Sequence, residues 1–149
     1  MSLNTKVIKY LNELLKHTFD AVKGYKDAAR NITDQELKDF FIERAREKLL
    51  LEEALKAEIK SLKGKPLEAG SFMNIFQRSW TNFKTSLDHD NVKEICDFCI
   101  SEERKAIKEY GIILRNEKLV SDKFYRILES QNEKNLKSIE ALLEKMERL

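Results

Sequence analysis

The chain has 149 residues, enough for a substantial core, and we expect residues 1–149 to form a single domain. Lys and Arg number 28 against 26 Asp and Glu, a net charge of +2, so the chain lacks the basic field typical of nucleic-acid binding. We therefore expect no nucleic-acid partner. The chain also has neither a long apolar run nor a signal-peptide pattern, which predicts a cytoplasmic protein without a membrane partner. Only four Gly and one Pro predict long helices and argue against a phosphate-binding loop.

Five helices are predicted from apolar residues that recur at steps of three and four. They cover about residues 4–31, 34–63, 71–87, 91–115 and 122–148. The four long helices would be rods of about 40 Å. Short connections join the first two and the last two, whereas a loop and the short helix link the second long helix to the third. The pattern predicts an all-α fold, a ferritin-like up-down four-helix bundle with a long second-to-third crossover that carries an extra helix.

The second predicted helix has a polar centre. Thr33 and Glu36 at its start have the spacing of a capping box. Farther along, Arg44 and Lys48 lie on the stripe that is expected to face inward, with Lys48 at the midpoint. The first helix offers only Thr18 at this height as a polar side chain on its stripe.

The crossover helix has an aromatic face. Its members are Phe72, Phe76, Trp80 and Phe83. We interpret this face as the side that packs on the bundle, and a ligand groove or a dimer interface is the alternative.

The helix predicted at 91–115 has a carboxylate on its apolar stripe, because a step of three from Cys99 falls on Glu102. A buried carboxylate is costly unless it is paired, protonated or bound to a metal. The last helix also has polar residues, Asn132 and Asn135, at mid-height. We therefore predict a polar core layer of Lys48, Glu102, Asn132 and Asn135, with an ion pair between Lys48 and Glu102. Metal ligation by Glu102 is the alternative.

Few other residues could bind a metal. Ferritin-like carboxylate proteins use Glu-x-x-His motifs, and this sequence has none. His17, with Glu13 and Asp20 nearby, could hold a metal at the surface, but solvated side chains are the favoured interpretation. Cys96 and Cys99 lack the second Cys/His pair of a zinc site, so we predict buried free thiols.

Several short patterns follow one another in a characteristic order along the chain. They are Gly24-Tyr25, Ala28-Ala29, Glu36-Leu37, the stretch 78–84, and Glu102-x3-Ala106-x3-Tyr110. In order and spacing, over nearly the whole chain, they resemble a bacterial ferritin-like family of unknown function. The resemblance implies a ferritin-like fold without an established activity. It also implies that Glu47 and Glu102 are retained metal ligands of a degenerate site, in which Val22, Leu50 and Leu136 are apolar replacements.

Together these patterns favour a non-catalytic ferritin-like bundle, an interaction or stress-associated protein with a degenerate metal site and no cofactor. A homodimer is the candidate assembly. One alternative is a di-iron or di-manganese protein that uses Glu47 and Glu102 as ligands. Another is a protein that binds an apolar ligand beside Trp80.

Overall fold

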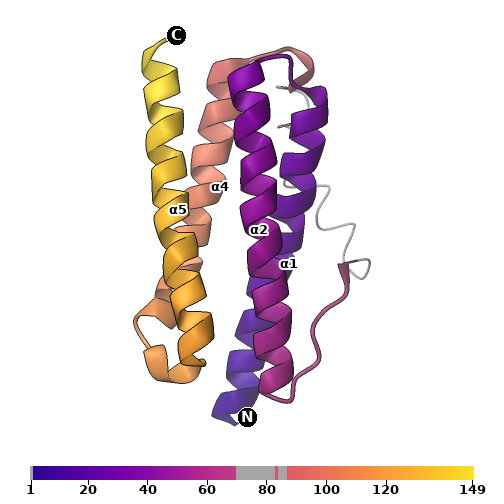
Figure 1. The fold of residues 1–149 in the computed structure, drawn as a ribbon, viewed down its shortest axis with the longest axis vertical. Helices are drawn as coiled ribbons and strands as arrows, with labels where there is room; N and C mark the ends of the chain where they lie inside the picture. Colours follow the sequence, from indigo (N-terminus) through magenta and orange to yellow (C-terminus); the bar gives the residue numbers. More distant parts are fainter. Residues whose placement is uncertain (1, 70–82, 84–86) are drawn as a thin grey trace.

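The structure is a computed structural model that describes residues 2–69, 83 and 87–149. Within these residues the regular structure is entirely helical, so the predicted all-α fold is confirmed (Figure 1). The elements are α1 (Leu3–Asn31), α2 (Gln35–Ser61), α4 (Val92–Leu114), the short 3₁₀ helix η2 (Glu117–Leu119) and α5 (Asp122–Glu147). None of the described helices is both long enough and apolar enough to cross a membrane.

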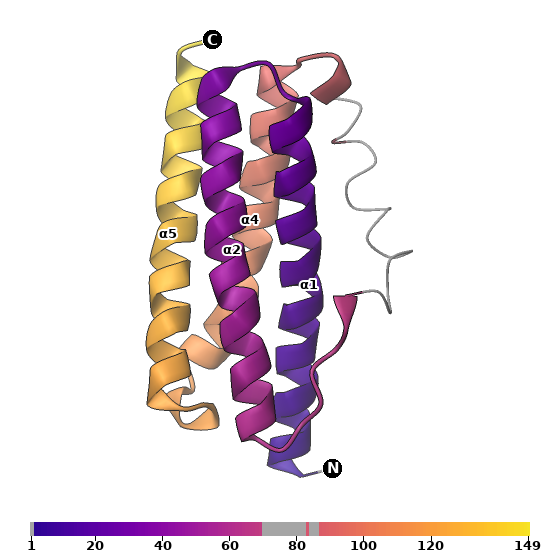
Figure 2. The same ribbon diagram turned by 45° about the vertical axis from the view of Figure 1, so that its right-hand side comes forward.

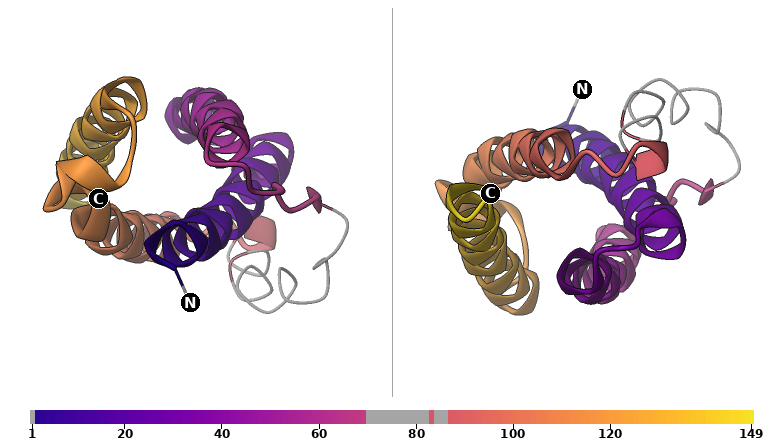
Figure 3. Two further views of the ribbon diagram at one scale, coloured as in Figure 1. Left: turned by 90° about the horizontal axis from the view of Figure 1, so that it is seen from below. Right: turned by 90° about the horizontal axis from the view of Figure 1, so that it is seen from above.

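The four long helices form two helical hairpins that lie side by side (Figures 1 and 2). α1 and α2 are antiparallel, α4 runs in the same direction as α2, and α5 is antiparallel to α4. The connection from α2 to α4 therefore has to return along the length of the bundle. Viewed end-on, the helices follow one another around the bundle in the order α1, α2, α5 and α4 (Figure 3).

Each long helix begins at a side chain that accepts a backbone N–H, as expected for N-caps. For α2 the cap is Asp34, whose carboxylate accepts from the Leu37 N–H at 2.9 Å. The predicted capping box of Thr33 and Glu36 is therefore wrong. The reason is a contact between segments far apart in sequence, since the Thr33 hydroxyl donates to the Asp90 carboxylate. The other long helices are capped by Ser2, Asn91 and Ser121.

The buried apolar residues form two clusters, one toward each end of the bundle. The cluster at the α1–α2 turn includes Tyr25, Phe41, Ile95, Cys99 and Leu142. The cluster at the α4–α5 turn includes Leu11, Leu15, Leu51, Leu55, Ile113 and Leu128. Cys96 and Cys99 are both buried free thiols, as predicted, and burial raises the pKa of Cys96 to about 11.

Phe83 is the one described residue of the aromatic face predicted for the crossover helix. It is buried, its ring stacks on Phe98 with the centroids 4.4 Å apart, and its edge meets Phe41. At this position the connection between α2 and α4 packs on its own bundle. Phe72, Phe76 and Trp80, and most of the predicted helix at 71–87, lie outside the described residues.

Candidate functional site

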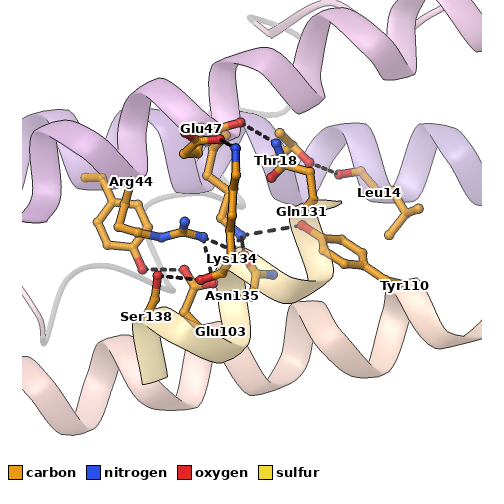
Figure 4. Close-up of polar contacts among 12 residues, drawn as sticks. Leu14, Thr18, Arg44, Glu47, Glu103, Tyr110, Gln131, Lys134, Asn135 and Ser138 are labelled. Atoms are coloured by element: carbon orange, nitrogen blue, oxygen red, sulfur yellow. Dashed lines mark hydrogen bonds and ion pairs between the residues drawn. The ribbon is translucent and has the colours of Figure 1, made fainter. Parts of the chain in front are cut away.

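A layer of polar side chains lies at mid-height between the two apolar clusters. Figure 4 shows the contacts within this layer. Arg44 and Lys48 reach into it from α2, Glu103 from α4, and Gln131 and Asn135 from α5. The exposed fraction of each of these five residues is 3% or less. Because charged groups this deeply buried are destabilising without partners, their contacts decide what the layer can do.

Glu103 is the centre of the layer. Its Oε1 accepts from the Tyr25 hydroxyl at 2.6 Å, and its Oε2 accepts from Arg44 Nη2 at 3.1 Å and from Lys48 Nζ at 3.3 Å. Burial alone would raise the pKa of Glu103, but Lys48, Arg44 and the Tyr25 hydrogen bond outweigh it and hold the pKa below its usual value. The carboxylate is thus ionised, and two buried cations share one anion.

Asn135 completes the coordination of the two cations. Its Oδ1 accepts from Arg44 Nη2 at 2.5 Å and from Lys48 Nζ at 3.2 Å, as Figure 4 shows for Arg44. Lys48 Nζ also contacts the Tyr110 hydroxyl at 3.4 Å. With Glu103, Asn135 and Tyr110 around it, the ammonium has one partner for each of its three N–H groups.

A second polar group closes the side of the layer between α2 and α5. The Glu47 carboxylate is buried and accepts from Lys134 Nζ and from Arg46 Nη2, both at 2.7 Å. The Glu47 carbonyl accepts from the Gln131 amide at 2.8 Å (Figure 4). Both oxygens of this predicted metal ligand are therefore bound to cations of the chain itself.

The predicted ion pair between Lys48 and Glu102 is wrong. The Glu102 side chain is 27% exposed and pairs with Lys105 at 3.1 Å, while Glu103 takes the inward place. From Cys99 a step of three reaches Glu102 and a step of four reaches Glu103, and both continue to the same later apolar residues. Successive residues of a helix are rotated by about 100°, and the periodicity does not determine which of the two glutamates faces inward. The packing of α4 on its neighbours determines it.

Other predicted members of the site fall in different places. Asn135 is fully buried, as predicted, whereas Asn132 is only half-buried. Leu50 and Leu136 are exposed and do not lie in the layer as the resemblance implied, although Val22 is buried. Within the described residues, a few buried polar atoms have no hydrogen-bond partner: Arg44 Nε, Gln131 Oε1, Asn132 Oδ1 and Asn135 Nδ2.

The sequence pattern gave no role in the layer to Arg44, Glu103 or Gln131, nor to Tyr25, which donates to Glu103. Arg44 and Tyr25 lie on the inward stripes of their helices, and an arginine on such a stripe is itself a signal that a buried acid faces it. The identity of that acid depends on α4, which lies across the bundle.

A pocket of about 200 Å³ opens between α1 and α4 beside the layer. Lys48, Glu103, Tyr25 and Tyr110 line it together with the following residues of α1 and α4: Leu14, His17, Thr18, Asp20, Ala21, Glu102, Lys105, Ala106 and Glu109. The pocket thus connects the polar layer with the charged surface of these two helices.

His17 lines this pocket and has a partner that the sequence did not indicate. Its Nδ1 lies 2.6 Å from Glu109 Oε2, and this hydrogen bond raises the pKa of His17. The alternative of a surface metal site with Glu13 and Asp20 has no support in this geometry. Among the described residues, no three His, Cys, Asp or Glu side chains are grouped so that they could hold a metal ion.

The described helices define an all-α four-helix protein with an ion network buried at mid-height. The chain belongs to the family described as "Domain of unknown function (DUF2383)", whose model matches residues 6–116. Neither a curated protein nor a solved structure matches the chain. The family match includes α1, α2 and α4 and ends before α5, so it is shorter than the predicted resemblance, and Gln131 and Asn135 lie beyond it.

Proposed function

We propose that this protein is a non-catalytic ferritin-like bundle, in which the chain's own cations occupy the centre and the outer faces bind a protein partner. The helix directions support the ferritin-like topology. α2 and α4 run in parallel (Figure 1), so the chain between them has to span the length of the bundle, as it does in bundles with one long crossover.

The observation that carries the proposal is the position of Lys48. Its ammonium lies 3.3 Å from the Glu103 carboxylate and 3.2 Å from Asn135, among buried acceptors of facing helices. Ferritin-like carboxylate proteins place their metal ions among inward-facing side chains in the core of the bundle. Arg44 adds a second cation 3.1 Å from the same carboxylate. A metal ion would meet two positive charges at short range in a medium of low dielectric constant.

The alternative of a di-iron or di-manganese site with Glu47 and Glu102 as ligands is disfavoured by their contacts. Glu47 accepts from Lys134 and Arg46, and Glu102 pairs with Lys105 on the other side of the layer. The alternative of an apolar ligand beside Trp80 concerns residues outside the described part of the chain.

Exposed apolar side chains support a role in protein interaction. Ile42 and Leu49 are exposed on α2 and lie seven residues apart, which places them on one face of the helix. Leu136 and Leu143 form a second such pair on α5. Exposed apolar patches often mark interaction sites, and a second copy of this chain is the first candidate partner.

Metal analysis tests the proposed centre. We expect protein purified without a chelator, and then incubated with Fe²⁺ or Mn²⁺ and desalted, to hold well under one metal ion per chain. Stoichiometric metal that is lost in both Glu103→Gln and Glu47→Gln, but kept in the surface variant Glu53→Gln, would overturn the non-catalytic proposal.

Light scattering tests the proposed partner. We expect the mass of a dimer, reduced to that of a monomer by Ile42→Lys combined with Leu49→Lys. The exposed change Lys9→Glu serves as the control and should leave the dimer intact. A wild-type mass of one chain at high protein concentration would contradict the homodimer.

A further inference from the structure

Asp20 is an exception among the acids that line the pocket between α1 and α4. It is 9% exposed, and within the described part of the chain its carboxylate makes no hydrogen bond or ion pair. The other acids of the pocket all have partners. Glu102 pairs with Lys105 at 3.1 Å, Glu103 with Lys48 at 3.3 Å, and Glu109 with His17 at 2.6 Å. A buried, unpaired carboxylate is destabilising unless a cation binds beside it.

We propose that this pocket binds a small organic cation, an amine with a short apolar body, and that Asp20 is the counter-ion of its ammonium group. The proposal does not rest on the function proposed above: Lys48 and Glu103 of the ion network line the pocket, but Asp20 belongs neither to that network nor to the outer apolar faces. It requires only that the pocket be open on the α1–α4 side.

The charge of the pocket favours a cation. Four carboxylates line it (Asp20, Glu102, Glu103 and Glu109), against two lysines and one histidine (Lys48, Lys105 and His17). With His17 neutral or protonated, the lining carries a net negative charge. The other three carboxylates are paired with cations of the chain, including Arg44 at Glu103, so Asp20, which has no partner, offers the strongest attraction for a positive group.

The size and lining of the pocket favour an organic cation over a metal ion. Its volume is about 200 Å³, and a cavity of about 150 Å³ is enough to bind benzene. Leu14, Ala21 and Ala106 supply apolar contacts, and two tyrosines lie among the lining residues. A metal ion such as Ca²⁺ or Mg²⁺ needs about six or more oxygen ligands, and the described acids are not grouped in that way.

The raised pKa of Asp20 agrees with the absence of a cationic partner. Burial raises its pKa to about 6, and Glu102 raises it further, while His17 and Lys16 act in the opposite direction. At neutral pH the group is thus ionised, but at a free-energy cost that a bound ammonium would relieve.

A titration followed by ¹H–¹⁵N NMR tests the proposal, with benzylammonium as the probe and benzyl alcohol as its neutral counterpart of similar shape. We expect saturable shifts at the backbone amides of α1 and α4 around Asp20 and Ala106. Benzyl alcohol should bind at least about tenfold more weakly, because it lacks the charge that Asp20 recognises. In Asp20→Asn the affinity for benzylammonium should fall by about tenfold or more.

Asp27→Asn is the matched control, since Asp27 lies two turns farther along α1, has a side chain that is 46% exposed, and pairs with Arg30. Its affinity should equal that of the wild type. Ala106→Leu is a second variant that keeps Asp20 and fills part of the pocket, and it should also abolish binding.

Several results would overturn the proposal. They are equal affinities for the amine and the alcohol, undiminished binding to Asp20→Asn, or no shifts at roughly 20 mM benzylammonium. Asp20-dependent binding of Mn²⁺, detected by paramagnetic broadening, in place of the amine would identify a metal site and would also overturn it.

Discussion

The helical hairpins meet along two seams, one between α2 and α5 and one between α1 and α4, and the two seams differ in whether their buried acids have partners. Between α2 and α5, the Glu47 carboxylate lies between Lys134 and Arg46, and the Glu58 carboxylate accepts from the backbone and the hydroxyl of Ser121. Between α1 and α4, Asp20 is also buried, although at 9% it is more exposed than Glu47 and Glu58, and it has no hydrogen-bond or ion-pair partner among the described residues. One seam is closed by polar contacts, and the other contains a pocket.

This comparison shows that burial alone does not determine what an acid contributes. A buried carboxylate with cationic partners fixes the relative position of two helices, although its net contribution to stability can be small. A buried carboxylate without one destabilises the fold and remains available to a ligand. Acids at similar depth therefore have opposite expected effects when they are neutralised.

The largest effect is expected from Glu103→Leu. The change leaves Arg44 and Lys48 buried without their shared carboxylate. We expect the free energy of unfolding to fall by about 4 kcal/mol, measured by urea denaturation. The pH dependence should agree, since the pKa of Glu103 is lowered by folding and its contribution is lost as pH falls through that lowered value.

Glu102→Leu is the matched control for this change, because it alters the neighbouring residue of the same helix. Glu102 pairs only with the exposed Lys105 in the described structure, so its loss should cost less than about 0.5 kcal/mol. Equal losses for the two variants would contradict the assignment of Glu103 as the inward acid.

Replacing the whole charged group should restore stability. In the triple variant Arg44→Met, Lys48→Met and Glu103→Leu, no charge of this network remains buried. We expect its free energy of unfolding to return to within about 1 kcal/mol of the wild type, or to exceed it. If the triple variant is no more stable than Glu103→Leu alone, the three side chains do not act as one network.

The effect of Asp20→Asn on the free energy of unfolding should have the opposite sign, because this change should stabilise the protein. Folding raises the pKa of Asp20 from 3.8 to about 6, so the folded state binds more protons between these values and stability falls as pH rises through them. Removing the charge should add about 2 kcal/mol at pH 7. Thermal unfolding from pH 4 to pH 7 measures the effect, and the gain should vanish near pH 4. A loss of stability at pH 7 would show that Asp20 has a partner after all.

A smaller effect than those of Glu103→Leu and Asp20→Asn is expected from Glu47→Gln. The side chains of its partners Lys134 and Arg46 are 43% and 59% exposed, and the Glu47 carbonyl keeps its hydrogen bond from Gln131. We expect a loss of about 1 kcal/mol in urea denaturation, reduced further at high salt because exposed partners are screened. A gain in stability, as expected for Asp20→Asn, would mean that the two seams do not differ as described.

The sequence by itself determined the four long helices and the height of the polar layer. Apolar spacing and cap residues are local properties, so the helix bounds lie close to those predicted, and Lys48 and Asn135 were placed in the layer from their positions on apolar stripes. The burial of Cys96 and Cys99 followed from the same periodicity.

Only the tertiary structure decided which of two adjacent glutamates faces inward, and which residues meet across the helices. The partners of Glu103 and His17, and Lys134 beside Glu47, come from helices far away in the sequence, at separations that no local pattern encodes. The exposure of Leu50 likewise depends on how α2 is rotated against its neighbours. A rotation of about 100° per residue separates a buried ion network from a surface salt bridge, and packing alone selects between them.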